Sequence, residues 1–239
     1  MIERIDINDL TYEKFMAEYA DKKPVIITGA MNDWNSFNWT LEKFGQLYGE
    51  RSVPIRESTI DGVRNFKKVN LAEYINYLEH NENNWYCDWN FHTFGDQDLV
   101  QTYKPLDIFT RETVRINTKK QIFKWFFLGS ANTQTPLHQD FDNTHAWNAV
   151  IFGQKEWIFF EKSDSPYLYE GKVDLFSDYD LEDYPLLEQA NPMKIVQNAG
   201  EIIYAPRFWW HQVRNTESTL AVSENFWFET ELLNGDSKF

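Results

Sequence analysis

Hydrophobic and polar residues follow two different periods along the chain, and the change falls near Trp85. Before this point, apolar residues recur at helical spacing in three segments: 11–19, 41–48 and 71–78. Short apolar runs at 25–28 and 53–56 have the length and composition of strands. The first part of the chain, about 1–84, is therefore predicted to hold helices and short strands.

From Trp85 onward the alternation is typical of β-strands. The segments predicted to be strands are 85–90, 122–128, 137–140, 146–152, 155–160, 202–205 and 219–228. The sequence contains no repeat, and no flexible linker separates the two parts. The helices are therefore expected to pack against a sheet. The prediction is one α+β domain over residues 1–239, mainly β, with a β core at about 85–228 that forms a barrel or two sheets.

One stretch, 163–198, lacks a regular period and carries eight acidic residues against two lysines. The favoured interpretation is a solvated surface excursion in which Pro166, Pro185 and Pro192 are turn residues. A docking surface for a basic substrate is the alternative.

Charge and cysteine content narrow the possible partners and surroundings. The chain has 23 Lys and Arg against 37 Asp and Glu, a net charge of -14, which disfavours nucleic acid and anionic membranes as partners. The single cysteine, Cys87, has no internal partner for a disulfide, and the first residues lack the basic and apolar regions of a signal peptide. No apolar run approaches the roughly 20 residues that span a bilayer. A cytoplasmic location without membrane insertion is therefore expected.

His138 and Asp140 are two residues apart in a segment predicted to be extended, so the period of a strand would place both side chains on one face. A third ligand has to come from elsewhere, and His211 stands out because it follows a turn, a strand and an aromatic corner. Two histidines and one carboxylate form the facial triad that suits non-heme Fe(II). The same three ligands with a bound water would also suit zinc in a hydrolase, so the triad alone does not name the reaction.

Gly153-Gln154 is interpreted as a two-residue hairpin turn, which makes Phe152 face Lys155 across the ladder. The residues that then share the inward face are Asn148, Val150, Phe152, Lys155, Trp157 and Phe159. A lysine in such surroundings needs an anionic partner, which a dicarboxylate cosubstrate would supply. A register shifted by one residue, with Lys155 at an exposed hairpin end, fits the pattern equally well.

Two other predicted strands carry small polar residues at alternate positions. Ser223 and Asn225 interrupt the apolar segment 219–228, and Tyr86 and Asp88 do the same after Trp85. Each pair would face one cavity or, alternatively, water on a half-exposed sheet. Their coincidence in several strands favours the cavity.

Taken together, these motifs resemble the JmjC family in its small, cupin-like hydroxylase branch, over nearly the whole chain. The segments that carry the resemblance are Lys23–Gly29 with Asp33 and Trp34, Thr135–Asp140, Ala146–Ala149 with Gly153, Lys155 and Trp157, and Gly200–Val213. The third of these is similar to the corresponding segment of the JmjC lysyl hydroxylases of splicing factors. The resemblance implies a double-stranded β-helix (jelly-roll or cupin) core with N-terminal helices packed on it.

The resemblance also implies the roles of individual residues. His138, Asp140 and His211 would hold Fe(II), to which 2-oxoglutarate and O₂ bind. Lys155, helped by Thr135, would pair with the distal carboxylate of 2-oxoglutarate. The residues expected to line the pocket of this cosubstrate are Asn148, Tyr86, Ser223 and Asn225. Substrate selectivity is expected at Asp88, Trp89 and Trp147.

The function implied is that of a 2-oxoglutarate-dependent dioxygenase that hydroxylates a side chain of a protein or peptide, with succinate and CO₂ as co-products. Demethylation is disfavoured, because the zinc-binding cysteines that often accompany histone demethylases are missing. The alternatives are hydroxylation of a small metabolite or a tRNA base, and a non-catalytic cupin-like metal-binding module. Only residues 229–239 follow the last predicted strand, where several family members have dimerisation helices, so a monomer or a differently formed homodimer is expected.

Overall fold

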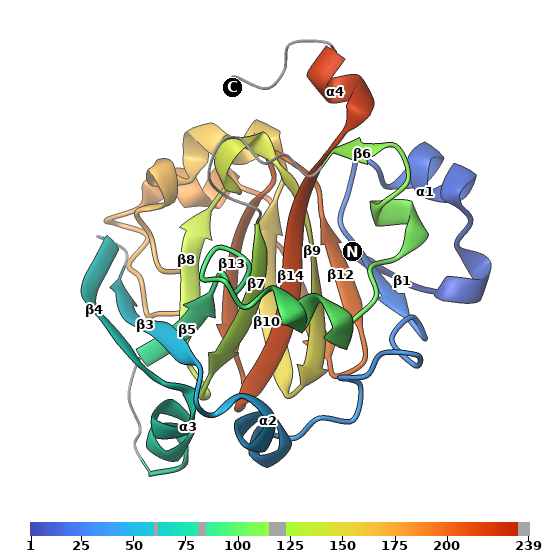
Figure 1. The fold of residues 1–239 in the computed structure, drawn as a ribbon. Helices are drawn as coiled ribbons and strands as arrows, with labels where there is room; N and C mark the ends of the chain where they lie inside the picture. The colour runs from blue at the N-terminus through green and yellow to red at the C-terminus, as the bar shows by residue number, and fades with distance from the viewer. Residues whose placement is uncertain (60–61, 81–84, 115–122, 234–239) are drawn as a thin grey trace.

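The computed structural model describes residues 1–59, 62–80, 85–114 and 123–233, and its core consists of two sheets packed face to face (Figure 1). The larger sheet contains, in spatial order, β1 (Glu3–Asp6), β2 (Val25–Thr28), β12 (Ile202–Ala205), β9 (His145–Phe152), β14 (Thr219–Phe228), β7 (Lys124–Gly129), β5 (Trp85–Trp89), β3 (Ser52–Thr59) and β4 (Gly62–Asn70), with β6 (Thr113–Val114) beside β14. The smaller sheet contains β11 (Met193–Asn198), β10 (Gln154–Phe160), β13 (Trp210–Asn215) and β8 (Gln134–His138). The mainly β fold with a jelly-roll core is confirmed.

The helices of the first part of the chain follow the prediction closely. The structure contains α1 (Tyr12–Glu18), α2 (Leu41–Tyr48), α3 (Leu71–His80) and, after the last strand, α4 (Glu229–Leu233). Short 3-10 helices lie at Ile7–Asp9, Gln97–Thr102, Asp107–Phe109, Phe141–Asn143, Lys162–Tyr167, Tyr169–Gly171 and Pro185–Gln189. Thr11 and Thr40 cap α1 and α2, because each hydroxyl accepts a hydrogen bond of 3.1 Å from a backbone N–H of the first turn. None of the helices in the described residues is long and apolar enough to cross a membrane.

An aromatic core holds the helices against the outer face of the larger sheet. Phe15 of α1 meets Tyr204 of β12 edge to face, with ring centroids 5.0 Å apart, and Phe44 of α2 packs on Phe126 of β7 at 5.6 Å. All four side chains are buried, and burying a side chain of this size contributes about 1.5–3 kcal/mol. The larger sheet is therefore fixed from outside, which leaves its inner face free to line a cavity.

The connection between β9 and β10 corrects the predicted hairpin. The two strands lie in different sheets, and β10 pairs with β11 and β13 rather than with β9. Gly153 makes this crossing with a φ of 85°, and a Cβ atom there would lie 2.3 Å from the carbonyl oxygen of Ser218. Phe152 consequently packs with the outer core, not on the face that it was predicted to share with Lys155.

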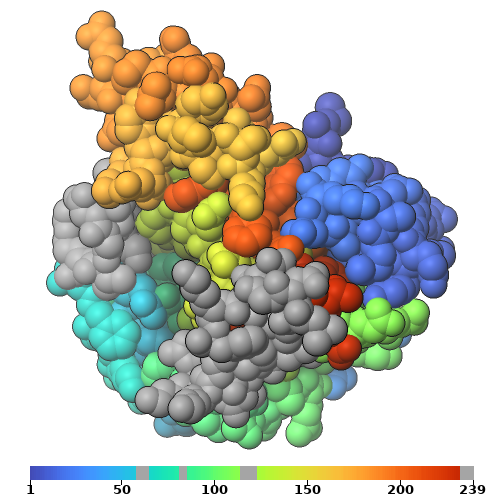
Figure 2. Space-filling view, turned by 90° about the horizontal axis from the view of Figure 1, so that it is seen from above, coloured from blue at the N-terminus to red at the C-terminus, as the bar shows by residue number. Residues whose placement is uncertain are grey.

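The acidic stretch 163–198 is irregular only over its first part, since its last six residues form β11. The preceding residues are held by apolar contacts on the outer side of the smaller sheet, where Leu168 and Leu187 pack with Ile158 and Phe160. In Figure 2 this segment forms the yellow-to-orange lobe on the upper face of the molecule. The prediction of a surface excursion is correct, but irregular structure up to residue 198 is wrong.

Several other boundaries differ from the prediction. Strand β8 ends at His138, so the predicted strand 137–140 is two residues too long at its end. The start of the predicted strand 122–128 lies partly outside the described residues, and β7 begins at Lys124. The strands that the sequence pattern does not indicate are β1, β4, β6, β11 and β13.

Candidate metal centre

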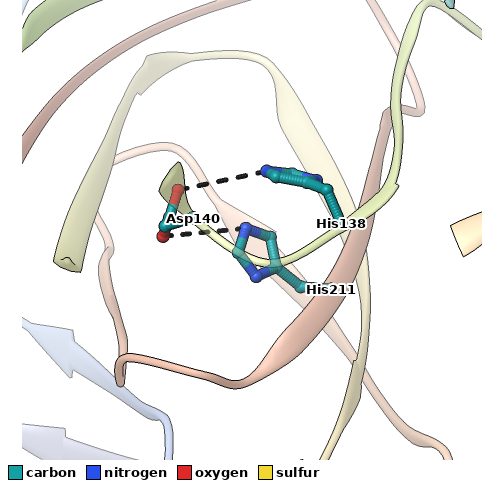
Figure 3. Close-up of side chains that lie close together, drawn as sticks. All are labelled: His138, Asp140 and His211. Carbon is teal, nitrogen blue, oxygen red and sulfur yellow. Dashed lines mark ion pairs between the residues drawn. The ribbon is translucent and has the colours of Figure 1, made fainter. Parts of the chain in front are cut away.

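The three predicted metal ligands lie together at one end of the smaller sheet (Figure 3). His138 and His211 are direct partners in the ladder between β8 and β13, which brings their ring centroids to 4.3 Å. Asp140 follows the end of β8 in extended backbone, with φ −58° and ψ 139°. Its two carboxylate oxygens lie 4.0 Å from the Nε2 atoms of His138 and His211, respectively. The two histidines are therefore placed by strand pairing and Asp140 by a loop.

Hydrogen bonds orient both imidazole rings toward Asp140. The Nδ1 atom of His138 lies 2.7 Å from the carbonyl oxygen of Pro136, and that of His211 lies 3.2 Å from the carbonyl of Trp209. A carbonyl oxygen only accepts, so Nδ1 carries the proton in each ring and the Nε2 lone pair points to the carboxylate. Burial lowers the pKa of His211 to about 4, assisted by the charge of His138. His211 is thus neutral at physiological pH, as a metal ligand must be.

Asp140 keeps one oxygen without a hydrogen bond. Among the described residues, Oδ2 of Asp140 is buried and accepts no hydrogen bond, although burying such an oxygen unpaired costs free energy. A divalent cation between this oxygen and the two Nε2 atoms would remove the cost. Two imidazoles and one carboxylate, all from one side, suit non-heme Fe(II), and a zinc ion would accept the same atoms.

A buried lysine shares the cavity with the candidate ligands. The side chain of Lys155 is 2% exposed, and its ammonium donates to Oδ1 of Asn215 over 2.8 Å and to the hydroxyl of Tyr86 over 3.2 Å. Both acceptors are neutral, and no carboxylate in the described part of the chain pairs with this ammonium. Burial therefore lowers the pKa of Lys155 to about 7. An anionic group in the cavity would stabilise the charged lysine.

The remaining residues predicted to bind the cosubstrate also line this cavity, which has a volume of about 260 Å³. They are Tyr86, Thr135, Asn148, Ser223 and Asn225. Asn148 presents a buried Oδ1 atom that accepts no hydrogen bond from the described residues. Ser223 donates to the carbonyl of Trp147 over 2.6 Å, and Asn225 donates to Thr144 over 3.0 Å. Strands of both sheets thus contribute polar groups to one cavity.

Of the three residues predicted to select the substrate, the structure places only Asp88 at the cavity. Trp89 and Trp147 are 0% and 1% exposed and belong to the aromatic core on the opposite face of the larger sheet. A role for these two tryptophans in direct substrate contact is therefore wrong. Successive side chains of a strand point to opposite faces, and each tryptophan directly follows or precedes a cavity residue.

Asp88 lies on a wall that is otherwise aromatic. Its carboxylate accepts a hydrogen bond of 2.5 Å from Arg56, and burial raises its pKa to about 6 although Arg56 opposes this shift. Phe127, its partner across the ladder between β5 and β7, lines the cavity together with Trp125 and Phe141, and Phe141 is 42% exposed. Sequence reasoning missed these aromatic residues as well as Asn215, whose strand β13 it did not identify.

Comparisons with known proteins agree with this geometry. The family model described as a cupin-like domain matches residues 12–234. The lysine-specific demethylase JMJ21 of Arabidopsis thaliana is 28% identical and covers 91% of this chain, and the match is 24% of its own length. The 2-oxoglutarate and iron-dependent oxygenase JMJD4 of Gallus gallus is 28% identical, and the match covers 92% of this chain and 59% of the relative. The bifunctional arginine demethylase and lysyl-hydroxylase psr-1 of Caenorhabditis elegans is 27% identical, and the match covers 94% of this chain and 61% of the relative. The chain therefore spans about a quarter to three-fifths of the length of these relatives.

Proposed function

The chain belongs to the family of cupin-like domains, and from this premise we propose that it is an Fe(II)- and 2-oxoglutarate-dependent oxygenase that hydroxylates a side chain of a protein or peptide. The similar proteins of Gallus gallus and Caenorhabditis elegans carry names that describe iron-dependent oxygenation and lysyl hydroxylation. These names describe the relatives, and the residues of this chain supply the argument for the same activity here.

The observation that carries the proposal is the position of Lys155 in the same cavity as the three candidate metal ligands. A hydrolytic zinc site needs a metal and a water, and it has no use for a buried ammonium without a carboxylate partner. A dicarboxylate that chelates the metal with one end and pairs with Lys155 at the other satisfies both parts of the cavity. This combination favours an oxygenase over a hydrolase and over a metal-binding module without turnover.

His138, Asp140 and His211 would hold the iron, and the remaining polar residues of the cavity would hold the cosubstrate. Lys155, with Tyr86 beside it, would bind the distal carboxylate of 2-oxoglutarate. When bound, Fe(II) and 2-oxoglutarate supply the oxidising chemistry from O₂, with succinate and CO₂ as co-products. Trp157 and Val213 line the same cavity and would exclude water around the reacting groups.

The side chains around Asp88 in the cavity favour a cationic side chain as the target. Asp88 offers a carboxylate, while Trp125 and Phe127 offer aromatic surface to the aliphatic stem and the charge of a lysine or arginine. Relatives named as arginine-specific demethylases and lysyl hydroxylases act on the same two residue types. The net charge of -14 also favours a basic peptide over a nucleic acid.

Mass spectrometry of peptides tests this proposal. The protein, supplied with Fe(II), ascorbate, 2-oxoglutarate and air, is incubated with a library of peptides that contain lysine, arginine or their methylated forms. A gain of about 16 Da on an unmethylated side chain is the expected product, because an iron oxygenase inserts one oxygen atom. Loss of a methyl group from a methylated peptide, with no gain on unmethylated ones, would replace hydroxylation by demethylation. Absence of any modified lysine or arginine, together with turnover of a small metabolite, would contradict a protein substrate.

A further inference from the structure

A second cluster of charged and titratable side chains lies outside the cavity, where α4 meets the start of β9 and the segment after β12. Oε1 of Glu231 lies 2.8 Å from Nε2 of His145, which is completely buried, and 3.2 Å from Nε of Arg207. Oε2 of Glu231 accepts a hydrogen bond of 2.9 Å from the backbone N–H of Phe228. Arg207 also makes two hydrogen bonds, of 2.9 and 3.0 Å, to the carboxylate of Asp21.

The hydrogen bonds of His145 fix its role in this cluster. The backbone N–H of Arg207 donates to Nδ1 of His145 over 3.2 Å, and the hydroxyl of Tyr204 lies 2.7 Å from the same atom. That hydroxyl accepts a hydrogen bond of 3.1 Å from the backbone N–H of Asp21, so its own proton is free to point to Nδ1. Nδ1 is therefore an acceptor, and Nε2 carries the proton that is donated to Glu231.

This cluster is not a second metal site. Asp21, His145 and Glu231 have ligand atoms within 4.8 Å of one another, which is the spacing of a possible cation site. The guanidinium of Arg207 already lies between the two carboxylates, and the Nε2 atom of His145 is occupied by its proton. The positive charge that the two acids require thus comes from the chain itself.

The cluster joins two segments that contain the candidate metal ligands, one that ends at His145 and one that begins at Arg207. His145 is the first residue of β9 and closes the connection from His138 through Asp140. Arg207 lies between β12 and β13, four positions before His211. Pairing between β8 and β13 fixes the two histidine ligands, but no strand holds Asp140. Asp140 is thus held from both sides: Gln139 before it donates to the carbonyl of Phe208, and the loop after it ends at His145, which pairs with Phe226 of β14 and bonds to Glu231.

We propose that Glu231 is a positioning residue for the metal centre. By accepting from His145 and forming an ion pair with Arg207, it ties the start of β9 to the segment before β13 and so helps to hold Asp140 at the correct distance from the two histidines. The inference rests on the proposed function only in assuming that the triad binds a divalent metal. Groups that hydrogen-bond directly to a metal ligand typically contribute 10- to 100-fold in metal affinity. Glu231 acts through His145 and Arg207, neither of which is a ligand, so its contribution is expected at the lower end of this range.

Co(II) binding to the full chain tests the inference without turnover, because Co(II) reports on its ligands through its visible absorption. We expect E231A to bind Co(II) about tenfold more weakly than the wild type and to show an altered absorption band. E231Q retains an oxygen that accepts from His145, so its affinity is expected to lie between those of E231A and the wild type. E229A changes an exposed glutamate of the same helix and is expected to bind as the wild type does.

The outcomes separate positioning from general stabilisation of the fold. A lower melting temperature in E231A with unchanged Co(II) affinity and spectrum would overturn the inference and leave the metal site intact. If E231A does not fold, E231Q and H145Q decide. Wild-type Co(II) affinity in folded E231Q, together with weakened Co(II) binding in folded H145Q, would overturn a role for the carboxylate of Glu231. Failure of the wild type itself to bind Co(II) would overturn both this inference and the proposed function.

Discussion

The ammonium group of Lys155, a residue that is only 2% exposed, lies 2.8 Å from the amide oxygen Oδ1 of Asn215. An amide orients the lysine but supplies no negative charge to offset it. The cost of burying this ammonium is therefore only partly recovered in the free protein. Binding of a dicarboxylate would recover the rest, and this is the role that we propose for Lys155.

Replacement of Lys155 is expected to weaken cosubstrate binding more than metal binding. K155A removes the positive charge at the far end of the cavity but leaves the three candidate ligands unchanged. We expect the 2-oxoglutarate concentration for half-maximal turnover to rise at least about tenfold, since a charged hydrogen bond contributes about 1.5–3 kcal/mol. Turnover measured as succinate release tests this, with Co(II) affinity as the control. An unchanged 2-oxoglutarate requirement would refute the role given to Lys155.

The affinity for 2-oxoglutarate is expected to depend on pH near neutrality. Burial lowers the pKa of free Lys155 to about 7, and a bound carboxylate raises it again. The lysine of the free protein loses its proton as the pH rises through about 7, so binding above this pH requires proton uptake. Affinity should be constant below about pH 6 and fall by up to about tenfold per unit above pH 7. Calorimetry at several pH values measures this.

A guanidinium at position 155 provides the control for the pH dependence, because it stays charged over the whole range. K155R should bind 2-oxoglutarate with an affinity that changes little between about pH 6 and 9. A steep pH dependence that persists in K155R would show that another group titrates.

Asp88 is expected to select the charge of the substrate. D88N keeps the size of the side chain and its hydrogen-bonding capacity toward Arg56 but removes the negative charge on the cavity wall. Turnover of a lysine peptide should fall by about tenfold or more, while substrate-free release of succinate stays the same. D178N, in the acidic lobe, makes the same chemical change away from the cavity and should leave peptide turnover unaltered. Equal losses in both variants would indicate a general effect of net charge.

The crossing at Gly153 is expected to be intolerant of a side chain. G153A places a Cβ 2.3 Å from the backbone oxygen of Ser218 at a φ of 85°, so the two sheets would have to shift. Gly95 has a similar φ of 93° with no atom within 4 Å of an added Cβ. G95A should therefore show only the backbone strain, about 1 kcal/mol, whereas G153A should lose clearly more. Urea unfolding of both variants measures the difference, and equal losses would contradict the close approach at Gly153.

Lys155 points inward, which is one of the two directions that the sequence pattern left open, although the predicted hairpin is wrong. A strand's own alternation decides which residues share a face, whereas its neighbours are decided by the packing of distant segments. The same alternation places Trp147 and Asn148 on opposite faces of β9, and Trp89 and Asp88 on opposite faces of β5. Strict use of the alternation would have excluded both tryptophans from the cavity.

Other parts of the site carry no local signal. The sequence of strand β13 is largely polar because Gln212 and Arg214 face outward. Gln212 bonds to Asp174 over 2.7 Å, and Arg214 bonds to Glu156 over 2.8 Å. These partners come from other elements, so the strand and its residue Asn215, which accepts from Lys155, are recognisable only in the fold. The link between Glu231 and His145 joins residues 86 positions apart and is likewise a product of tertiary packing.

The most direct test of the proposed oxygenase is anaerobic titration of the protein with Fe(II) and 2-oxoglutarate, followed by admission of air. We expect the weak visible absorption of the metal–cosubstrate chelate before air is admitted and release of succinate afterwards. D140A, which removes the loop-borne ligand, should lose both signals. Absence of chelate absorption and of succinate in the wild type, under conditions in which the protein is folded, would contradict the assignment of His138, Asp140, His211 and Lys155 to one catalytic site.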